Sequence, residues 1–256
     1  MNSSTKTHLT ILTGASRGMG LAMAQQLLQP GHTLLCISRN TQPSLTELVD
    51  TIDDATLAQW ALDLNDGAAA NAQLARWLGL FLGDEFSSAT LINNAAIVPK
   101  VAPLRDVSSA DIASVLRVGL EAPMQLTAAF LKATSHWSGT RKVLNISSGN
   151  GRRAMASQAS YSAAKAGMDH YSRVVAIEEA AKPNGAKICS LAPGIIDTDM
   201  QTQLRAADAN AFPDQKVFID YKNSGQLLSP EAAARRVLTY LARADFGTNP
   251  VADVRD

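Results

Sequence analysis

Cysteine is scarce in this sequence: Cys36 and Cys189 are the two cysteines among 256 residues. Each lies in a short apolar run, so we expect two buried, unpaired thiols and a reducing compartment rather than a disulfide framework. Aromatic residues make up 5% of the chain and charged residues 18%, whereas hydrophobic residues make up 46%. This composition excludes a disordered segment and supplies enough apolar surface for a sizeable core.

Neither sign of charge is in excess, since 23 basic residues balance 23 acidic ones. The balance gives no electrostatic reason to expect nucleic acid or an anionic membrane as a partner. Long hydrophobic runs are also missing: no apolar stretch approaches the roughly 18 residues of a membrane span. The first 12 residues contain no signal-peptide core. We therefore expect a soluble, cytoplasmic protein, and we assign no residue to a metal.

A short strand, a glycine turn and a helix are expected near the start. Residues 8–13 are apolar, residues 14–20 are GASRGMG, and an amphipathic stretch then runs to Gln29. In this context the turn predicts a pyrophosphate site, because amides at a helix start bind phosphate and glycine lets it approach. The alternative is a plain tight turn. The candidate cofactor contacts here are Gly14, Ser16, Arg17, Gly18, Met19 and Gly20.

The end of the second apolar run, residues 33–38, decides which nicotinamide cofactor is expected. An acidic side chain there would bind the ribose 2′-hydroxyl of NAD, whereas arginine suits the 2′-phosphate of NADP. The sequence has Ser38 and Arg39 at this position and no carboxylate. We therefore predict NADP, with Arg17 as a second phosphate ligand. The alternative is that both arginines are simply solvated.

Apolar runs and helical patterns alternate along the rest of the chain. Further strands are expected at 59–62, 90–93, 143–146, 186–191 and 250–254, and further helices at 43–55, 67–82, 108–132, 157–181 and from Ser229 onward. This alternation predicts one α/β domain over residues 1–256: a Rossmann-like, doubly wound parallel sheet of about seven strands with helices on both faces. Residues 198–228 lack a strong period, and we expect short helices there that cover the substrate.

Polar residues that follow strands are candidate ligand contacts, because ligands bind at the carboxyl ends of parallel strands. Asp63 and Leu64 follow the third expected strand, where Asp63 could bond an adenine edge. Asn93, Asn94 and Ala95 follow the fourth, where two amides could support the turn beneath the ribose.

Three residues form a candidate catalytic group. Tyr161 and Lys165 are four residues apart, so a helix places them on one face, and Ser148 follows the strand at 143–146. A phenol with a pKa of about 10 is a poor acid near neutral pH. A nearby ammonium and an oxidised nicotinamide would stabilise the phenolate. The group suits proton transfer to a carbonyl that receives a hydride, although a lone Tyr-x-x-x-Lys pair can also be an exposed helix pair.

Taken together, these motifs resemble the short-chain dehydrogenase/reductase family over nearly the whole chain. The matching segments are Thr13-Gly14-x-x-x-Gly18-x-Gly20, Asn93-Asn94-Ala95, Ser148, Tyr161-x-x-x-Lys165 and Pro193-Gly194. The resemblance implies that Ser148 orients the carbonyl, Tyr161 donates the proton, and Lys165 binds the nicotinamide ribose and lowers the pKa of the tyrosine. It also implies cofactor contacts from Pro193, Gly194, Ile196 and Thr198, the last with the nicotinamide amide.

The carboxyl-terminal third resembles the sepiapterin reductase-like and benzil reductase-like branch of that family, through residues 191–201, residues 224–229 and the ending with Asp253. This resemblance implies NADPH-dependent reduction of a small-molecule ketone or vicinal diketone, either on a pterin or on a benzil-like compound. It implies that Asp253 anchors the guanidine-like edge of a pterin by a charge-assisted contact. The alternatives for Asp253 are a strand-end carboxylate or a subunit contact. We also expect Gly149, Met155 and Met200 at the substrate.

One position departs from the family pattern. Gly119 stands where the family usually has asparagine, which holds a water that links the lysine to solvent. We expect waters to relay the proton here. The alternatives are slow turnover or a catalytically weak NADP-binding regulatory protein. A third alternative for the function is an NAD-dependent alcohol or steroid dehydrogenase.

Two further features bear on substrate and assembly. Arg152 and Arg153 follow the candidate catalytic serine and could face an acidic substrate or simply solvent. The family resemblance implies a homodimer or homotetramer packed through the helices at 121–134 and 157–181.

Overall fold

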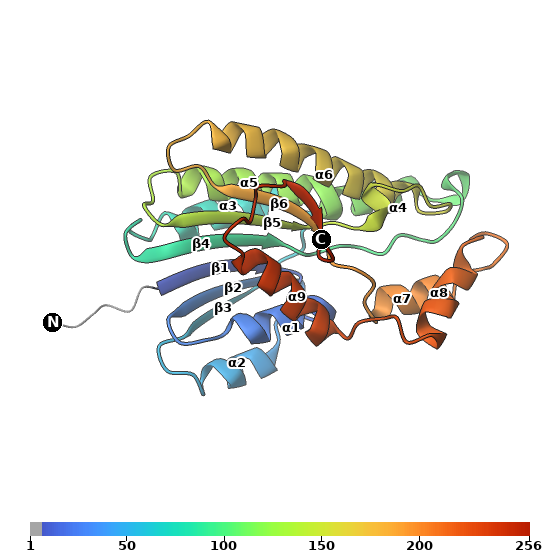
Figure 1. Cartoon of the computed structure of the whole chain (residues 1–256), viewed down its shortest axis with the longest axis horizontal. Coiled ribbons are helices and arrows are strands. Elements are labelled where there is room, and N and C mark those ends of the chain that lie inside the picture. The colour runs from blue at the N-terminus through green and yellow to red at the C-terminus, as the bar shows by residue number, and fades with distance from the viewer. Residues whose placement is uncertain (1–6) are drawn as a thin grey trace.

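Seven parallel strands form one sheet in the computed structural model, which describes residues 7–256 (Figure 1). Their order across the sheet is β3-β2-β1-β4-β5-β6-β7. The strands are β1 Thr7–Thr13, β2 His32–Ser38, β3 Thr56–Ala61, β4 Phe86–Asn93, β5 Thr140–Ile146, β6 Lys187–Ala192 and β7 Val251–Asp253. The winding direction reverses between β1 and β4, which opens a crevice at their carboxyl ends. The predicted doubly wound sheet is confirmed.

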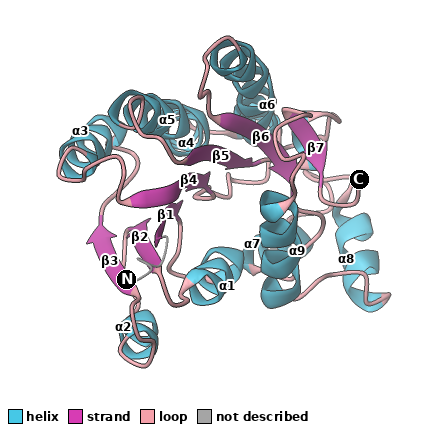
Figure 2. Cartoon of the chain, turned by 60° about the vertical axis from the view of Figure 1, so that its left-hand side comes forward, coloured by secondary structure: helices cyan, strands magenta, loops and turns pink. Residues whose placement is uncertain are grey.

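Helices cover both faces of the sheet (Figure 2). One face carries α1 Gly18–Leu27, α2 Pro43–Val49 and α9 Pro230–Ala242, and the other carries α3 Gly67–Leu78, α4 Ser109–Leu116, α5 Ala122–Ala133 and α6 Ala159–Ala180. Alternate strand residues supply the two cores: Leu9 and Ile11 pack under α3 and α5, whereas Leu12 packs under α1 and α9. Strands buried on both faces explain why the sequence shows continuous apolar runs.

The predicted helix at 108–132 is two helices joined by a π-helical turn. α4 ends at Leu116, the turn spans Arg117–Glu121, and α5 begins at Ala122. The Ser108 hydroxyl caps α4 by accepting the Asp111 amide at 3.1 Å. Pro123 lies in the first turn of α5, where its missing amide costs little. The π turn places Gly119 against α6.

Residues 198–228 contain two short helices, α7 Asp199–Arg205 and α8 Gln215–Asn223. They lie beyond the carboxyl ends of the strands, at the right of Figure 1. Leu204, Phe212 and Phe218 form their small core, against which Met155 and Met200 pack. That this segment covers a substrate stays a prediction.

Both cysteines are buried and free. Among residues 7–256, no helix is long and apolar enough to cross a bilayer. The expectation that the chain carries no export signal concerns in part residues 1–6, which lie outside the described residues.

Candidate functional site

A cavity of about 690 Å³ opens at the carboxyl edge of the sheet. The glycine turn after β1 lines one end, the segment after β5 and the start of α6 line the middle, and α7 and α8 line the other end. All the residues that the sequence proposes for catalysis, cofactor or substrate line this cavity, with the exceptions of Asn93 and Arg152. The fold therefore brings together motifs that are far apart in the chain.

The glycine turn is closely packed at Gly14 and Gly20, where no side chain fits. Gly14 has a φ of +71°, and a Cβ on Gly20 would lie 2.0 Å from the Gly14 carbonyl oxygen. The Asn94 amide holds this turn by donating to the carbonyl oxygens of Thr13 at 3.0 Å and Gly14 at 3.2 Å. Since α1 begins at Gly18, its first amides are available to a pyrophosphate.

Asn93 corrects the sequence prediction. Its side chain lies inside the fold and donates to Asn145 Oδ1 at 2.8 Å and Thr127 Oγ1 at 3.2 Å. The residue is buried and does not line the cavity. In a parallel sheet, successive side chains point to opposite faces, so Asn94 and not Asn93 reaches the turn.

The end of β2 fits the ribose of a nicotinamide dinucleotide. The Ser38 hydroxyl is buried at the cavity wall and has no hydrogen-bond partner within residues 7–256. Arg39 is exposed beside it. Arg17 donates to Asp199 of α7 at 2.8 Å, and both side chains are largely exposed. This surface ion pair is weak, so a phosphate could compete for Arg17 at low cost.

Ser148, Tyr161 and Lys165 meet in the middle of the cavity. Ser148 follows the end of β5 and accepts the Asn150 amide at 3.2 Å. Lys165 is buried, donates from Nζ to the Ile146 carbonyl oxygen at 2.6 Å, and lies 5.7 Å from the centroid of the Tyr161 ring. One helix and one strand end thus fix a hydroxyl, a phenol and an ammonium around one space.

Burial acts on both titratable groups of this site. It raises the pKa of the Tyr161 phenol, and the hydrogen bond with Ser148 acts in the opposite direction. It lowers the pKa of Lys165 to about 8, against the opposing effect of the Asp169 charge. Burial therefore works against the lowered tyrosine pKa that the sequence predicts, and the Lys165 charge and an oxidised nicotinamide have to overcome it.

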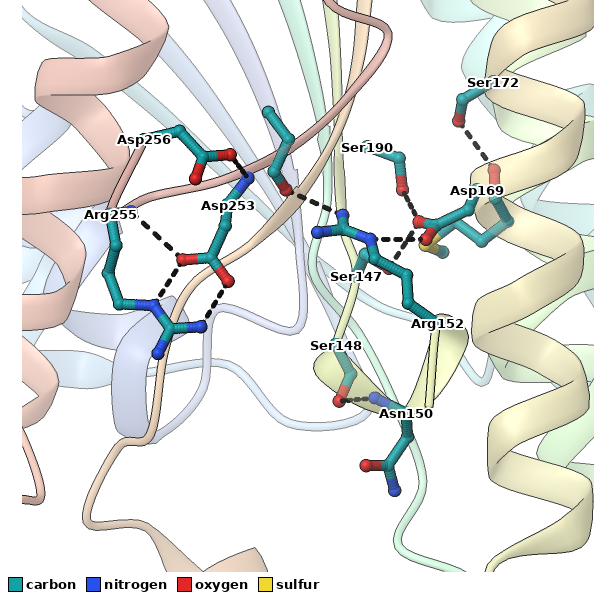
Figure 3. Close-up of polar contacts among 12 residues, drawn as sticks. Ser147, Ser148, Asn150, Arg152, Asp169, Ser172, Ser190, Asp253, Arg255 and Asp256 are labelled. Atoms are coloured by element: carbon teal, nitrogen blue, oxygen red, sulfur yellow. Dashed lines mark hydrogen bonds and ion pairs between the residues drawn. The ribbon is translucent and has the colours of Figure 1, made fainter. Parts of the chain in front are cut away.

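Asp253 lines the cavity, but an arginine of the same chain already holds its carboxylate (Figure 3). Arg255 donates to it from Nε at 2.7 Å and from Nη2 at 2.6 Å. This bidentate pair lowers the pKa of Asp253. A guanidine-like ligand would have to displace Arg255, a competitor that the sequence pattern did not reveal.

The two arginines after Ser148 separate in the structure. Arg153 lines the cavity, whereas Arg152 does not. Arg152 instead donates to Asp169 and to the Ala252 carbonyl oxygen. Of the two, Arg153 alone keeps the position in which it could face an acidic substrate.

Two glutamines at the cavity escaped the sequence analysis. Gln158 and Gln201 line it, are buried, and each has one side-chain atom without a hydrogen-bond partner in the described part of the chain. Gln201 ends the segment 191–201 that carries the family resemblance, but nothing in the sequence pattern marked either glutamine as a ligand contact. They lie with Gly149, Met155 and Met200 among the residues that line the cavity.

Gly119 is buried, and a Cβ at this position would lie 3.1 Å from the Cβ of Ala164. Ala164, which lies between Tyr161 and Lys165 on α6, thus occupies part of the space that an asparagine stem would need. We expect Gly119→Asn to destabilise the protein by about 1–3 kcal/mol through overpacking. We also expect its rate of carbonyl reduction to stay within about threefold of the natural rate, because restoring a missing proton path would change the rate far more. Thermal melting and NADPH oxidation measure the two effects.

Ala164→Gly combined with Gly119→Asn is the matched control, because it opens the contact. A rate gain of several orders in the double variant would contradict the expectation and show that the proton path is interrupted in the natural chain.

Comparisons with known proteins place this geometry among nicotinamide-dependent enzymes. The family model described as short chain dehydrogenase matches residues 8–209. A benzil reductase ((S)-benzoin forming) of Bacillus cereus is 35% identical, covering 92% of this chain and 94% of that protein. A sepiapterin reductase of Xenopus laevis is 30% identical, covering 91% and 90%. A crystal structure of a putative 2-deoxy-d-gluconate 3-dehydrogenase from Agrobacterium tumefaciens with bound NADP is 27% identical, covers 98% of this chain and 96% of that one, and has a TM-score of 0.78.

Proposed function

The chain belongs to the short-chain dehydrogenase family, and on that basis we propose that it is an NADPH-dependent carbonyl reductase that acts on ketones or vicinal diketones. The observation that carries the proposal is that Ser148, Tyr161 and Lys165 line one cavity together with the glycine turn, whose free helix amides suit a phosphate. The relatives share this fold and this family. They also share the class of enzyme, which is an oxidoreductase that acts on carbonyl or alcohol groups with a nicotinamide cofactor.

The residues of the cavity divide the reaction between them. The nicotinamide, when bound, supplies the hydride that the carbonyl carbon receives. The Ser148 hydroxyl holds the carbonyl oxygen, and Tyr161 Oη gives its proton to that oxygen as negative charge develops there. The Lys165 ammonium stabilises the phenolate that remains and would bind the nicotinamide ribose. A proton from solvent then restores the phenol.

NADP rather than NAD fits the end of β2. Ser38 and Arg39 stand where an NAD enzyme would carry a carboxylate, and Arg17 lies in the glycine turn on the same side of the cavity. The Ser38 hydroxyl and the two guanidinium groups suit a 2′-phosphate, which accepts hydrogen bonds. The similar crystal structure from Agrobacterium tumefaciens, which contains bound NADP, supports the same choice.

The test is consumption of NADPH, followed by absorbance, with benzil, simple diketones and sepiapterin as substrates. We expect oxidation with the diketones and a lower rate with NADH. Binding of NADPH without oxidation across this panel would favour the NADP-binding regulatory protein instead. A preference for NAD with alcohols or steroids would favour a dehydrogenase that works in the oxidative direction.

A diketone is the better supported substrate, because Arg255 holds the carboxylate that a pterin edge would need. We expect Arg255→Ala to raise kcat/KM for sepiapterin about tenfold, because the Asp253 carboxylate becomes free for a charge-assisted contact with the pterin. We expect kcat/KM for benzil to stay within about threefold of the natural value. Steady-state kinetics on both substrates measure the difference.

The control is Asp253→Ala in the Arg255→Ala background, which should remove the gain for sepiapterin alone. Equal changes for both substrates would show that Asp253 does not contact a pterin.

We also propose that the protein assembles as a homodimer or homotetramer through α5 and α6. Large apolar side chains are exposed on these two helices: Met124 on α5, and Val174 and Ile177 on α6. Exposed apolar residues clustered on long helices commonly mark subunit interfaces. Sedimentation velocity of the purified protein measures the assembly directly.

A further inference from the structure

A buried carboxylate, Asp169, lies one helical turn after Lys165 on α6 and has no part in the reaction described above. Figure 3 shows its contacts with Ser147, Ser190 and Arg152. Its side chain is 3% exposed. Oδ1 accepts the hydroxyl of Ser147 at 2.5 Å and that of Ser190 at 2.7 Å, and Oδ2 accepts Arg152 Nε at 3.1 Å. A charge buried to this degree is costly unless it is paired and hydrogen-bonded, and here it is both.

The partners of Asp169 come from two neighbouring strands and from the loop that carries Ser148. Ser147 precedes Ser148 after β5, Ser190 belongs to β6, and Arg152 belongs to the loop before α6. Arg152 Nη2 also donates to the carbonyl oxygen of Ala252 in β7 at 2.7 Å, next to Asp253. One carboxylate on α6 thus ties three strand ends and the Ser148 loop to the helix that carries Tyr161 and Lys165.

The loop sits directly on the turn of α6 between Lys165 and Asp169. A Cβ on Gly151 would lie 3.0 Å from the Lys165 carbonyl oxygen and 3.1 Å from Asp169 Oδ2. Asp169 therefore fixes the distance between the Ser148 loop and α6. A shift of the loop or of the helix would move Ser148 relative to Lys165.

Asp169 is also a negative charge one helical turn from the Lys165 ammonium. Its charge favours the protonated lysine, against the effect of burial. The other titratable or charged groups coupled to the cluster are Tyr161, Arg152, Cys189 of β6 and Asp253 of β7. The π turn packs on the same helix through Gly119, which lies next to Ala164. Because this residue is glycine, the turn brings no polar side chain to that position.

We propose that Asp169 is a positioning residue: it holds the Ser148 loop in register with α6 and supplies the negative charge that keeps Lys165 an ammonium. The part of this inference that concerns turnover rests on the proposed carbonyl reduction, whereas the part that concerns the charge of Lys165 does not.

The test compares variants that change the charge with one that does not. Asp169→Asn keeps the shape and removes the charge, Ser190→Ala removes one hydrogen bond and keeps the charge, and Arg152→Gln removes the cation that screens Asp169. NMR of the lysine side chains, with Lys165 assigned by Lys165→Arg, gives the pH at which Lys165 is half titrated in each protein.

We expect Asp169→Asn to lower this pH by about one unit, Arg152→Gln to raise it, and Ser190→Ala to leave it in place. We also expect kcat for NADPH-dependent reduction to fall at least tenfold in Asp169→Asn, with KM for the carbonyl little changed. A purely structural role would lower melting temperatures without opposite shifts of the lysine titration.

An unchanged Lys165 titration in Asp169→Asn, or an equal shift in Ser190→Ala, would overturn the proposal. If Asp169→Asn does not fold, Arg152→Gln combined with Asp169→Asn decides, since this double variant leaves no unpaired buried charge. Lys165 should titrate at a lower pH in the double variant than in Arg152→Gln alone, and equal titrations would overturn the proposal. If the natural protein reduces no carbonyl, the proposed function fails, and the lysine titration still tests Asp169.

Discussion

Tyr161→Phe is expected to lower kcat for carbonyl reduction by about 10²–10⁴-fold, the range of a lost general acid. Phenylalanine fills the same buried space against Lys165, so packing and NADPH binding are expected to persist. What disappears is the hydroxyl that is hydrogen-bonded with Ser148 and that we propose as the proton donor. Steady-state NADPH oxidation measures the loss, and NADPH fluorescence measures binding.

Tyr171→Phe is the matched control for this experiment. Tyr171 is a buried tyrosine on the same helix, α6, but it does not line the cavity. The same chemical change there is expected to leave turnover within about threefold, well short of what a lost general acid would cost. Retention of more than a tenth of the activity in Tyr161→Phe would mean that the proton comes from another group.

Much of this architecture could be predicted because its signals are local. Strands buried on both faces give short apolar runs, and α6 shows Tyr161 and Lys165 at helical spacing. Once the strands are parallel, their carboxyl ends share an edge, so the glycine turn, Ser148 and Asp253 necessarily converge. The cavity thus follows from the order of the elements and not from any single motif.

The pairing of individual side chains could not be predicted in the same way. Arg152 bonds the Ala252 carbonyl oxygen, 100 residues away, and Arg17 pairs with Asp199, 182 residues away. Arg255 follows Asp253 closely in the chain, yet only the fold of the last turn shows that it holds that carboxylate. Such partners depend on tertiary packing, which leaves no periodic trace in the sequence.

Asn93 and Gly119 show the same limit at the level of one residue. A pattern places Asn93 beside Asn94, but the pleat sends the two amides in opposite directions, one to the core and one to the turn. A pattern also shows a missing asparagine at position 119. It does not show that Ala164 packs close to that position.

The pH dependence of turnover is expected to follow Lys165. Burial lowers the pKa of this lysine from 10.5 to about 8. The ammonium form of Lys165 stabilises the phenolate that Tyr161 leaves after proton transfer. This form is present below the lysine pKa and lost above it. Burial raises the pKa of Tyr161, so the phenol keeps its proton over the same range. Reductase activity should therefore be full below pH 8 and fall about tenfold per pH unit above it.

The quantity to measure is kcat/KM for NADPH between about pH 6 and pH 10, because this ratio reports the titration of the free protein. Lys165→Arg is the informative comparison: a guanidinium stays charged throughout this range, so the decline above pH 8 should disappear even where the rate itself is lower. A profile of the natural protein that stays flat to about pH 10 would show that the ammonium is not the group that limits turnover. If the decline persists in Lys165→Arg, the group that titrates is the phenol of Tyr161. The neighbouring cation would then lower the pKa of Tyr161 by more than burial raises it.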